Sequence, residues 1–410
     1  MPVQTRPDKL DALVASAQFD VCGNGCCGPS RPRPAAERYV YRASLPNGGT
    51  VNLFKVLLTN ACVNDCAYCV NRRGADTPRS AYTAEEMAGL FMDFYSRRLV
   101  QGLFLSSGIG GDANRTMSAL VDTVAILRQR YHYRDYIHLK IMPEADYGCV
   151  FEACRLADRV SVNMEAPTQA YLSRLSHRKD LARGIIERMH WVKGLKDGDA
   201  RLAPSGQTTQ FVVGGAGESD GDILGVVQDL YKDMGLQRAY FSAYHPVGDP
   251  RLEGVPATPP MREHRLYQAD WLARVYGFSP AEIKLAIGKS GNLSLARDPK
   301  HIIALASPWL FPVDVNRAGY EALIHVPGLG PVVAKRIVAA RADRRIDSLQ
   351  QLYKMRLLHQ AVPFIYFDGM PRSERQAPLP LPELEEAEAN TAESLHHVHD
   401  AVDGNLAARR

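Results

Sequence analysis

From residue 51 to residue 243 the hydrophobic positions alternate between two patterns. Short apolar runs typical of buried parallel strands are separated by longer segments with an apolar residue every three or four positions, the period of an amphipathic helix. Strands are predicted at Val51–Leu58, Leu99–Ser106, Tyr136–Met142, Arg159–Glu165, Gln207–Val213 and Ala239–Ala243. Helices are predicted at Thr83–Arg98, Arg115–Tyr131, Asp146–Ala157, Gln169–Ser176, Asp180–Lys193 and Ser219–Met234.

Six strand–helix units in series predict an α/β fold with a parallel sheet and right-handed crossovers, most simply curled into a partial barrel. With fewer than eight strands, such a TIM-like (βα)6 barrel keeps a lateral opening through which a large substrate can reach the centre. Barrels of this kind carry their sites at the C-terminal ends of the strands. We therefore expect the functional residues in the loops that follow the strands.

The sequence predicts four further regions on either side of the barrel segment 51–245. Residues 1–50 contain a predicted helix, Asp8–Phe19, and a loop rich in Cys, Gly and Pro. Residues 246–310 form a Pro-rich connector with helices, and residues 311–372 a small all-α helical hairpin domain. The acidic, Pro-rich residues 373–410 are expected to be a disordered tail.

Composition narrows the class of protein. The 410 residues are 46% hydrophobic, enough for two or more packed domains. The net charge is only +4, so any nucleic-acid surface must be a local patch. The first twenty residues lack the apolar core of a signal peptide, and no run of eighteen apolar residues exists. We therefore expect a soluble cytoplasmic protein without a membrane partner.

Three cysteines lie close together in the loop after the first barrel strand, at positions Cys62, Cys66 and Cys69. Thiolates are soft ligands that select iron–sulfur clusters or zinc. A zinc site would need a fourth ligand at similar spacing, and the next thiols, Cys149 and Cys154, fall in a predicted helix. A [4Fe–4S] cube on three thiolates leaves one iron open to a ligand. We favour this cluster over zinc or an incidental group of thiols.

A second group of thiols, Cys22, Cys26 and Cys27, lies in the Gly-rich loop near the N-terminus. An auxiliary metal is conceivable there. No fourth ligand is evident nearby, however, so we favour a loop with incidental cysteines.

The spacing C-x3-C-x2-C, with Tyr68 before the last cysteine, resembles the signature of the radical S-adenosylmethionine (SAM) superfamily. The resemblance implies a (βα)6 barrel and a [4Fe–4S] cluster whose free iron chelates SAM. It implies electron transfer that cleaves SAM to methionine and a 5′-deoxyadenosyl radical, and hence an electron donor such as flavodoxin or ferredoxin. Tyr68 either packs near the adenine of SAM or fills space beside the cluster.

The resemblance also assigns SAM contacts to the ends of three strands. Ser106, Ser107 and Gly108 stand where related enzymes carry a Gly-Gly-Glu-like motif for the SAM amino group, so here backbone carbonyls are expected to bind it. Because alternate strand residues share a face, Asn163 and Glu165 point together and are candidates for the ribose or the carboxylate of SAM. The alternative is a buried hydrogen-bonded pair without a ligand.

The fifth strand is followed by a glycine-rich turn that begins with Gly214 and Gly215. It resembles the Gly-x-Ile-x-Gly-type turn of the superfamily, whose backbone lies against the adenine. Taken alone, glycines between a strand and a helix indicate only a tight connection.

Residues 315–337 form a predicted helical hairpin around a Pro-Gly-Leu-Gly turn, and Pro331 opens its second helix. This resembles the helix–hairpin–helix motif of DNA-repair and DNA-uptake proteins. Amide groups at the start of the second helix would point at a phosphate and position a duplex without reading its sequence. The predicted nucleic-acid contacts are Pro327, Gly328, Gly330, Lys335 and Arg336.

The surrounding domain is mildly basic. Residues 311–372 carry nine basic and five acidic side chains, a local net charge of +4. This is a modest patch. The alternative is a helical pair that packs on the barrel or binds a protein.

A radical SAM barrel joined to a helix–hairpin–helix resembles one particular group. This group is the DNA modification/repair radical SAM proteins associated with uracil-DNA-glycosylase-like partners. The matching blocks lie at Leu103–Ile109, Tyr136–Lys140, Ser205–Gln210 and Arg262–Trp271, and the likeness covers Asp8 to Pro371. The cysteine-rich N-terminal loop and the acidic tail depart from the group. The resemblance implies DNA as substrate and a uracil-DNA-glycosylase-like protein as a partner.

Three functions follow from these observations. The leading hypothesis is a radical SAM enzyme that abstracts hydrogen from a DNA base or sugar. The second keeps the enzyme but makes RNA or a small metabolite the substrate, with the hairpin binding a protein. The third is a non-catalytic iron–sulfur protein that binds DNA and senses redox state.

Overall fold

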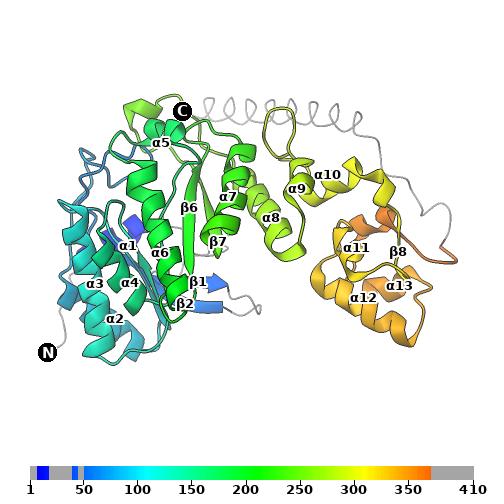
Figure 1. Ribbon diagram of the computed structural model, residues 1–410, viewed down its shortest axis with the longest axis horizontal. Helices are drawn as coiled ribbons and strands as arrows, with labels where there is room; N and C mark the ends of the chain where they lie inside the picture. The colour runs from blue at the N-terminus through cyan, green and yellow to red at the C-terminus, as the bar shows by residue number, and fades with distance from the viewer. Residues whose placement is uncertain (1–6, 18–38, 45–49, 371–410) are drawn as a thin grey trace, which may run out of the picture. The chain divides into compact units, whose positions relative to one another are not determined.

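The computed structural model describes residues 7–17, 39–44 and 50–370 (Figure 1). Within it the chain divides into two compact units, Met1–Glu263 and His264–Arg410. The predictions for the Cys22, Cys26 and Cys27 loop and for the tail 373–410 concern residues outside the described part of the chain.

The first unit is built on one seven-stranded sheet in the order β1-β2-β3-β4-β5-β6-β7. Strand β1 pairs antiparallel with β2, and β2 to β7 are all parallel. The bounds are β1 Val40–Ser44, β2 Thr50–Leu57, β3 Gly102–Ser106, β4 Ile137–Lys140, β5 Arg159–Ser161, β6 Gln207–Val213 and β7 Arg238–Ala243. Six parallel strands in sequence order with two unjoined edges form the predicted partial barrel, so this prediction is confirmed.

Helices cover the outer face of this sheet. Consecutive crossover helices contact one another, α2 with α3, α3 with α4, α4 with α6 and α6 with α7, which forms an outer ring of helices (Figure 1). Their bounds are α2 Ala84–Ser96, α3 Ala113–Gln129, α4 Tyr147–Leu156, α5 Gln169–Leu175, α6 Glu187–Gly198 and α7 Asp220–Met234. Helix α1, Pro7–Ala17, packs against β2.

The helix starts follow from local sequence. At the start of α2, Thr83 Oγ1 accepts a hydrogen bond from the Glu86 amide at 3.2 Å, and the Thr83 amide donates to Glu86 Oε2 at 2.8 Å. This reciprocal pair is a capping box, and it agrees with the helix start predicted at Thr83. Ser219 and Asp222 form the same arrangement at α7. Each cap fixes the residue at which a helix begins. It therefore also fixes where the preceding strand–helix loop ends.

Three elements differ from the sequence predictions. Strand β1 was not predicted, although the Asn47-Gly48 pair that follows it is a strong hairpin signal. The predicted strand Arg159–Glu165 ends as β5 at Ser161, because Met164 donates its amide to the Thr209 side chain and Glu165 has a left-handed backbone with φ 65°. The predicted helix Asp180–Lys193 begins with a π-helical segment, Leu181–Ile186, before α6.

The second unit is mostly helical. Its elements, with α8 beginning just before the division, are α8 Pro260–Tyr276, α9 Pro280–Lys284, α10 Pro299–Ala306, α11 Tyr320–His325, α12 Pro331–Asp343, α13 Leu349–Lys354, β8 Val313–Asp314 and β9 Ile365–Tyr366. Leu323, Val326, Leu329 and Ile337 are buried in its core. Among the helices described in both units, none has the length and apolar character needed to cross a membrane.

Candidate metal centre and hairpin

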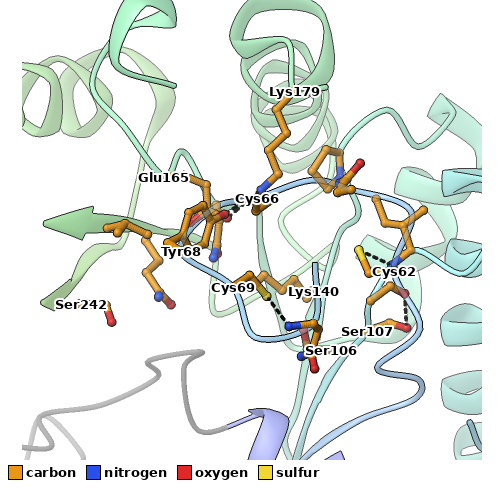
Figure 2. A pocket seen from close by; sticks show the side chains of 18 of the residues that line it. Cys62, Cys66, Tyr68, Cys69, Ser106, Ser107, Lys140, Glu165, Lys179 and Ser242 are labelled. Carbon is orange, nitrogen blue, oxygen red and sulfur yellow. Dashed lines mark hydrogen bonds and ion pairs between the residues drawn. The ribbon is translucent and has the colours of Figure 1, made fainter. Parts of the chain in front are cut away.

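A cavity of about 150 Å³ opens at the C-terminal ends of the parallel strands, where the topology predicts a site. The strand ends contribute Leu57, Ser106, Lys140, Val212, Ser242 and Ala243. The loops contribute residues that the sequence analysis singled out, namely Cys62, Cys66, Tyr68, Cys69, Ser107, Gly108, Asn163 and Glu165, together with Tyr244 and His245. The three cysteines, Lys140, Glu165 and Lys179 surround this space (Figure 2).

Cys66 is buried, whereas Cys62 and Cys69 are partly exposed and their sulfurs accept hydrogen bonds from backbone amides. The Ile109 amide donates to Cys62 Sγ at 3.4 Å, and the Asn71 amide donates to Cys69 Sγ at 3.4 Å. Burial raises the pKa of Cys69 to about 12 and also raises the pKa of Cys66. Coordination by a metal deprotonates such thiols, and the amides that point at two of the sulfurs stabilise the thiolates.

Three thiols around one cavity are a donor set that suits an iron–sulfur cluster. Among the described residues, no three His, Cys, Asp or Glu side chains converge closely enough to hold one metal ion. In an iron–sulfur cube each thiolate binds a different iron, so the sulfurs surround the cluster without meeting at one point. The three thiols around this cavity match that requirement.

Arg79 fixes the cysteine loop from behind. Its guanidinium donates to four carbonyl oxygens of the loop, from Asn60 at 2.7 Å, Asn71 at 2.9 Å, Arg72 at 2.8 Å and Ala75 at 3.1 Å. The planar fork of arginine suits several carbonyls at once. Irregular backbone is thereby held in one conformation without secondary structure.

A second anchor joins the cysteine loop to the segments after α5 and β7. Asp65 accepts hydrogen bonds from the Ser176 hydroxyl at 2.5 Å and from Arg251 Nη1 at 2.9 Å. Burial alone would raise the pKa of Asp65, but these partners lower it below its usual value. Arg72 forms an ion pair with Asp249 at 2.9 Å. The loop that carries the thiols is therefore attached to two neighbouring loops of the barrel mouth.

A buried ion pair faces the thiols across the cavity. Lys179 Nζ lies 3.0 Å from Glu165 Oε1 and donates to the Tyr68 hydroxyl at 3.0 Å. Burial alone would lower the pKa of Lys179, but the charges of Cys66 and Glu165 outweigh it and raise that pKa. Both side chains of the pair are less than a tenth exposed. Burying two charges costs several kcal/mol, which favours a functional reason for the pair.

Glu165 has two further unusual features. Its Oε2 is buried and has no hydrogen-bond partner in the described part of the protein. Its backbone is left-handed, a conformation that costs a non-glycine residue of order 1–3 kcal/mol and that clusters at functional sites. Asn163 lines the same cavity and is 8% exposed. The structure thus brings Asn163 and Glu165 together with the thiols, and leaves one carboxylate oxygen available to a ligand.

The residues after β3 also lie at the thiols. Ser106, Ser107 and Gly108 all line the cavity. A Cβ on Gly108 would lie 2.7 Å from the Ala61 carbonyl oxygen and 3.2 Å from Cys62 Cβ. Gly108 therefore allows the cysteine loop to approach β3, which is a packing reason for a glycine at this position.

The glycine-rich turn after β6 follows Val212, which lines the cavity, and Gly215 packs against the cavity residue Tyr244. Gly214 and Gly215 do not line the cavity. The Glu218 carboxylate accepts hydrogen bonds from the amides of Gly214 and Ala216, so the turn closes on itself. A Cβ on Gly214 would overlap Thr258 Oγ1. These contacts explain the glycines structurally.

The predicted hairpin is formed by α11, a turn, and α12. Gly328 has φ +74°, and a Cβ there would lie 2.6 Å from Gln360 Cγ. Gly330 is the N-cap residue of α12, whose first residue is Pro331. The first amides of a helix have no partner within it, so the turn offers several N–H groups. Pro327 belongs to the same turn, and Lys335 and Arg336 are exposed one turn further along α12.

Lys300 of α10 supports the turn from inside the second unit. Its Nζ donates to the Leu329 carbonyl at 2.6 Å and lies 4.7 Å from the Tyr276 ring centroid. Burial lowers the pKa of Lys300 to about 7. The Leu329 side chain is 1% exposed. The hairpin turn is therefore fixed both by its core leucine and by a buried lysine.

Sequence reasoning missed Lys140 and Lys179 in the cavity, Arg79 and Arg251 behind the cysteine loop, and Lys300 under the hairpin. Lys179 meets Tyr68 across 111 positions, and Arg251 meets Asp65 across 186. No local pattern could reveal such partners. Lys140 alone had a signal, since it lies near the C-terminal end of a predicted strand.

A family model described as the helix-hairpin-helix motif matches residues 312–362, in agreement with α11 and α12. The sequence has no significant match among curated proteins. Among solved structures, the chain is similar to HydG, a maturase of the [FeFe]-hydrogenase, with a TM-score of 0.42, 12% identity, and coverage of 53% of this chain and 49% of HydG.

A second similar structure is the FeFe-hydrogenase maturase HydG from Carboxydothermus hydrogenoformans, with a TM-score of 0.36 and 16% identity. It covers 47% of this chain and 45% of that chain. The chain thus spans about half the length of the HydG structures it matches. Likeness at this level carries no argument about chemistry, which must come from the residues of this chain.

Proposed function

We propose that this protein is a radical SAM enzyme that acts on DNA. One observation carries the proposal: Cys62, Cys66 and Cys69 surround a cavity at the strand ends into which Glu165 presents a buried, unpartnered carboxylate oxygen. When bound there, a [4Fe–4S] cluster and SAM would supply a 5′-deoxyadenosyl radical. The cofactor provides the reactivity, and the protein provides binding, orientation and exclusion of water.

Each wall of the cavity has a role in this proposal. The three thiolates would hold the cluster. Asn163 and Glu165 would bind hydroxyl or amino groups of SAM, and the carbonyls near Ser106 and Ser107 would accept from its amino group. Lys179 holds Glu165 and Tyr68 in place through two hydrogen bonds. Gly214 and Gly215 are proposed, from the resemblance alone, to lie against the adenine of SAM.

DNA as the substrate class is supported by the second unit. The hairpin turn presents backbone amides beside exposed Lys335 and Arg336, an arrangement suited to a phosphate and indifferent to base sequence. A base inside a duplex would have to be extruded to reach a cavity at a barrel mouth. A flavodoxin or ferredoxin as electron donor and a uracil-DNA-glycosylase-like protein as partner complete the proposal, on the strength of the resemblance alone.

The test is anaerobic incubation of the reconstituted full-length protein with SAM, a reductant and duplex DNA, damaged or undamaged. We expect 5′-deoxyadenosine by mass spectrometry, and a changed nucleoside in the digested DNA. Alanine at Cys62, Cys66 or Cys69 should abolish both products. Cys149→Ala, in α4 outside the cavity, is the matched control and should retain both.

Each alternative predicts a different result. A bound cluster without 5′-deoxyadenosine would refute the enzyme and leave a redox-sensing DNA-binding protein. Formation of 5′-deoxyadenosine with unchanged DNA, and stimulation by RNA or a metabolite instead, would refute DNA as the substrate. Zinc in place of iron in the reconstituted protein would remove the source of the radical.

A further inference from the structure

The unpaired positive charge of the hairpin domain is concentrated in one place. Three of its arginines form ion pairs with aspartates, Arg317 with Asp314, Arg344 with Asp347 and Arg345 with Asp368. Within residues 311–370, the basic side chains without a carboxylate partner are Lys335, Arg336, Arg341, Lys354 and Arg356. Three of these five, Arg336, Lys354 and Arg356, line a single groove.

This groove, called the α12–α13 groove below, has a volume of about 590 Å³. Helix α12 lines it with Arg336, Ala339, Ala340 and Asp343, and the end of α13 and the turn after it contribute Lys354 and Arg356. Arg336 Nη1 donates to the Met355 carbonyl oxygen at 3.3 Å, which connects the two walls. The two alanines have short side chains, and the three basic side chains are exposed. The groove is therefore shallow, and its charges can be reached from solvent.

Arg356 stands where helices often have a glycine. It follows the C-cap of α13 with a left-handed backbone, φ 72°. Its amide donates to the Tyr353 carbonyl at 2.8 Å, and the Leu357 amide donates to the Leu352 carbonyl at 3.1 Å, the two bonds of a Schellman motif. A side chain strains this backbone, and glycine would not. The same motif with Arg98, φ 58°, ends α2, so strain alone does not indicate a ligand.

What distinguishes Arg356 is the charge around it. Two other cations line the same groove, and Asp343 is the one carboxylate among the residues that line it. Three positive charges and one negative charge leave a net charge of +2. Exposed cations around a shallow floor suit an extended polyanion, whereas a small molecule needs a more enclosed and mostly apolar pocket. The guanidinium fork of arginine matches phosphate oxygens. The groove therefore favours a sugar–phosphate backbone over a small molecule.

The α12–α13 groove also continues the surface of the hairpin. Arg336 lies on α12 less than two turns after Gly330, the N-cap residue beside the amides proposed to bind a phosphate. From Arg336 to Asp343 the helix rises about 10 Å. One strand of B-DNA carries a phosphate for about every 3.4 Å of its axis, so successive phosphates can follow this line. This continuity favours a DNA backbone over an acidic peptide.

We propose that the α12–α13 groove is a second DNA-binding site, which holds the sugar–phosphate backbone next to the phosphate bound at the hairpin turn. Arg336, Lys354 and Arg356 contact phosphate oxygens, and Asp343 limits the affinity at one end. This inference rests on the proposed function, because it takes DNA as the partner of the hairpin domain. Each phosphate contacted in the groove makes DNA binding depend more steeply on salt.

The test is fluorescence anisotropy of the full-length protein with a labelled duplex of mixed sequence, at several salt concentrations. We expect Arg356→Gly to raise the Kd by about threefold or more at low salt and to lower the salt slope by about one, because one phosphate contact is lost. The same substitution relieves the left-handed strain, so the melting temperature should equal or exceed that of the wild type. Weaker binding by a protein of equal or greater stability excludes misfolding as the cause.

Arg98→Gly is the matched control, since it makes the same change in the same motif outside the groove. It should bind the duplex like the wild type. Asp343→Asn removes the negative charge of the groove and should lower the Kd. Equal Kd values for Arg356→Gly and Arg98→Gly, or a Kd that Asp343→Asn does not lower, would overturn the proposal. Tighter binding of poly-glutamate than of the duplex would assign the groove to an acidic protein and would also overturn it.

Because no turnover is measured, this result is separable from the proposed function. Weaker binding by Gly328→Ala but not by Arg356→Gly would refute the groove and keep DNA as the partner of the hairpin turn. Weaker binding by Arg356→Gly, in a protein that forms no 5′-deoxyadenosine with SAM and reductant, would keep the groove and refute the radical enzyme. A wild-type protein that does not bind the duplex would refute both DNA sites.

Discussion

Two buried lysines show how much the surroundings of a single residue decide. Lys179 and Lys300 are both almost fully buried, yet their pKa values move in opposite directions. Lys179 faces the Glu165 carboxylate and the cysteine sulfurs, whereas the hydrogen-bond acceptor of Lys300 is the Leu329 carbonyl. A buried lysine keeps its proton where an opposite charge is adjacent. It releases the proton more easily where only dipoles are available.

Removal of the Glu165 charge should weaken SAM binding. We expect Glu165→Gln to raise the Kd for SAM at least tenfold, because the buried oxygen loses its charge and Lys179 is left unpaired. The measurement is equilibrium binding to the reconstituted protein. The double variant Glu165→Gln/Lys179→Met should regain thermal stability without regaining affinity, which separates binding from folding. Glu152→Gln on α4 serves as control, and equal Kd values in all variants would contradict the role of Glu165.

Lys300 should make the second unit less stable at low pH. Its folded pKa of about 7 lies below the ordinary value of 10.5, so the unfolded chain binds more protons between these limits. The stability of the second unit therefore rises with pH through this window. The full free-energy cost of burying the charged Lys300 is present below pH 7. We expect Lys300→Met to be more stable than the wild type at pH 6, by about 2–4 kcal/mol after the lost hydrogen bond is subtracted.

The difference in unfolding free energy between Lys300→Met and the wild type should narrow by about 2–3 kcal/mol at pH 9, where Lys300 is neutral in the folded protein. Urea unfolding followed by Trp271 and Trp309 fluorescence, in a Trp191→Phe background, reports on the second unit alone. A difference that does not change with pH would show that Lys300 stays charged when folded.

At the scale of elements, both candidate sites are irregular loops that regular elements support. The cysteine loop has little secondary structure of its own, and Arg79 and Arg251 fix it by hydrogen bonds to its carbonyls. The hairpin turn is short and is held between two helices. In each case the rigid element supplies position and the loop supplies the chemical groups.

Shortening the Arg79 fork should weaken cluster retention. Arg79→Lys keeps the charge but cannot reach four carbonyls, so we expect a loss of about 2–4 kcal/mol of stability and less iron bound after anaerobic reconstitution. Iron and sulfide analysis and visible absorption measure the outcome. Arg97→Lys, on the surface after α2, is the control. Equal iron content in both variants would show that the thiols are positioned without the fork.

A side chain at Gly328 should abolish phosphate contact by the hairpin. Gly328→Ala would strain a left-handed residue and place a methyl group against Gln360. We expect duplex binding at least tenfold weaker, measured by fluorescence anisotropy. Gly369→Ala also puts a side chain on a left-handed residue, φ +92°, but in open space. It should bind like the wild type, and a similar loss in both would indicate general destabilisation.

At the scale of the molecule, two compact units carry different parts of the proposed reaction. The first holds the thiols in a mostly buried cavity, and the second presents exposed basic residues. Salt screens exposed charges far more than buried ones. The two activities should therefore respond differently to ionic strength.

Raising the salt concentration from about 50 to about 200 mM should reduce DNA modification steeply while SAM cleavage continues. The logarithm of the DNA binding constant falls by about 0.9 for each phosphate contacted, per decade of salt. We expect lost DNA product with 5′-deoxyadenosine nearly unchanged, measured in one reaction by mass spectrometry. Lys335→Ala should lower the salt slope by about one. A yield of modified DNA that does not change with salt would show that the hairpin takes no part in the reaction.

Much of the barrel could be predicted because its signals are local. Strand β6 has its predicted bounds, and Thr83 and Ser219, where the sequence predicted two helices to begin, are the N-caps of α2 and α7. The end of β5 could not be predicted, because the alternation of Ser161, Asn163 and Glu165 continues beyond Ser161, where β5 ends, up to the left-handed Glu165. Periodicity reports which face a residue is on, and cannot report where pairing stops.

The sequence by itself determined the order of strands and helices, the three thiols after β2, and the hairpin turn, because spacing and turn chemistry act over a few residues. Only the tertiary structure decided that Lys179 meets Glu165 and Tyr68, that Arg251 meets Asp65, and that Lys300 supports the hairpin turn. These facts depend on which distant segments become neighbours, and that choice is made by packing the whole chain at once.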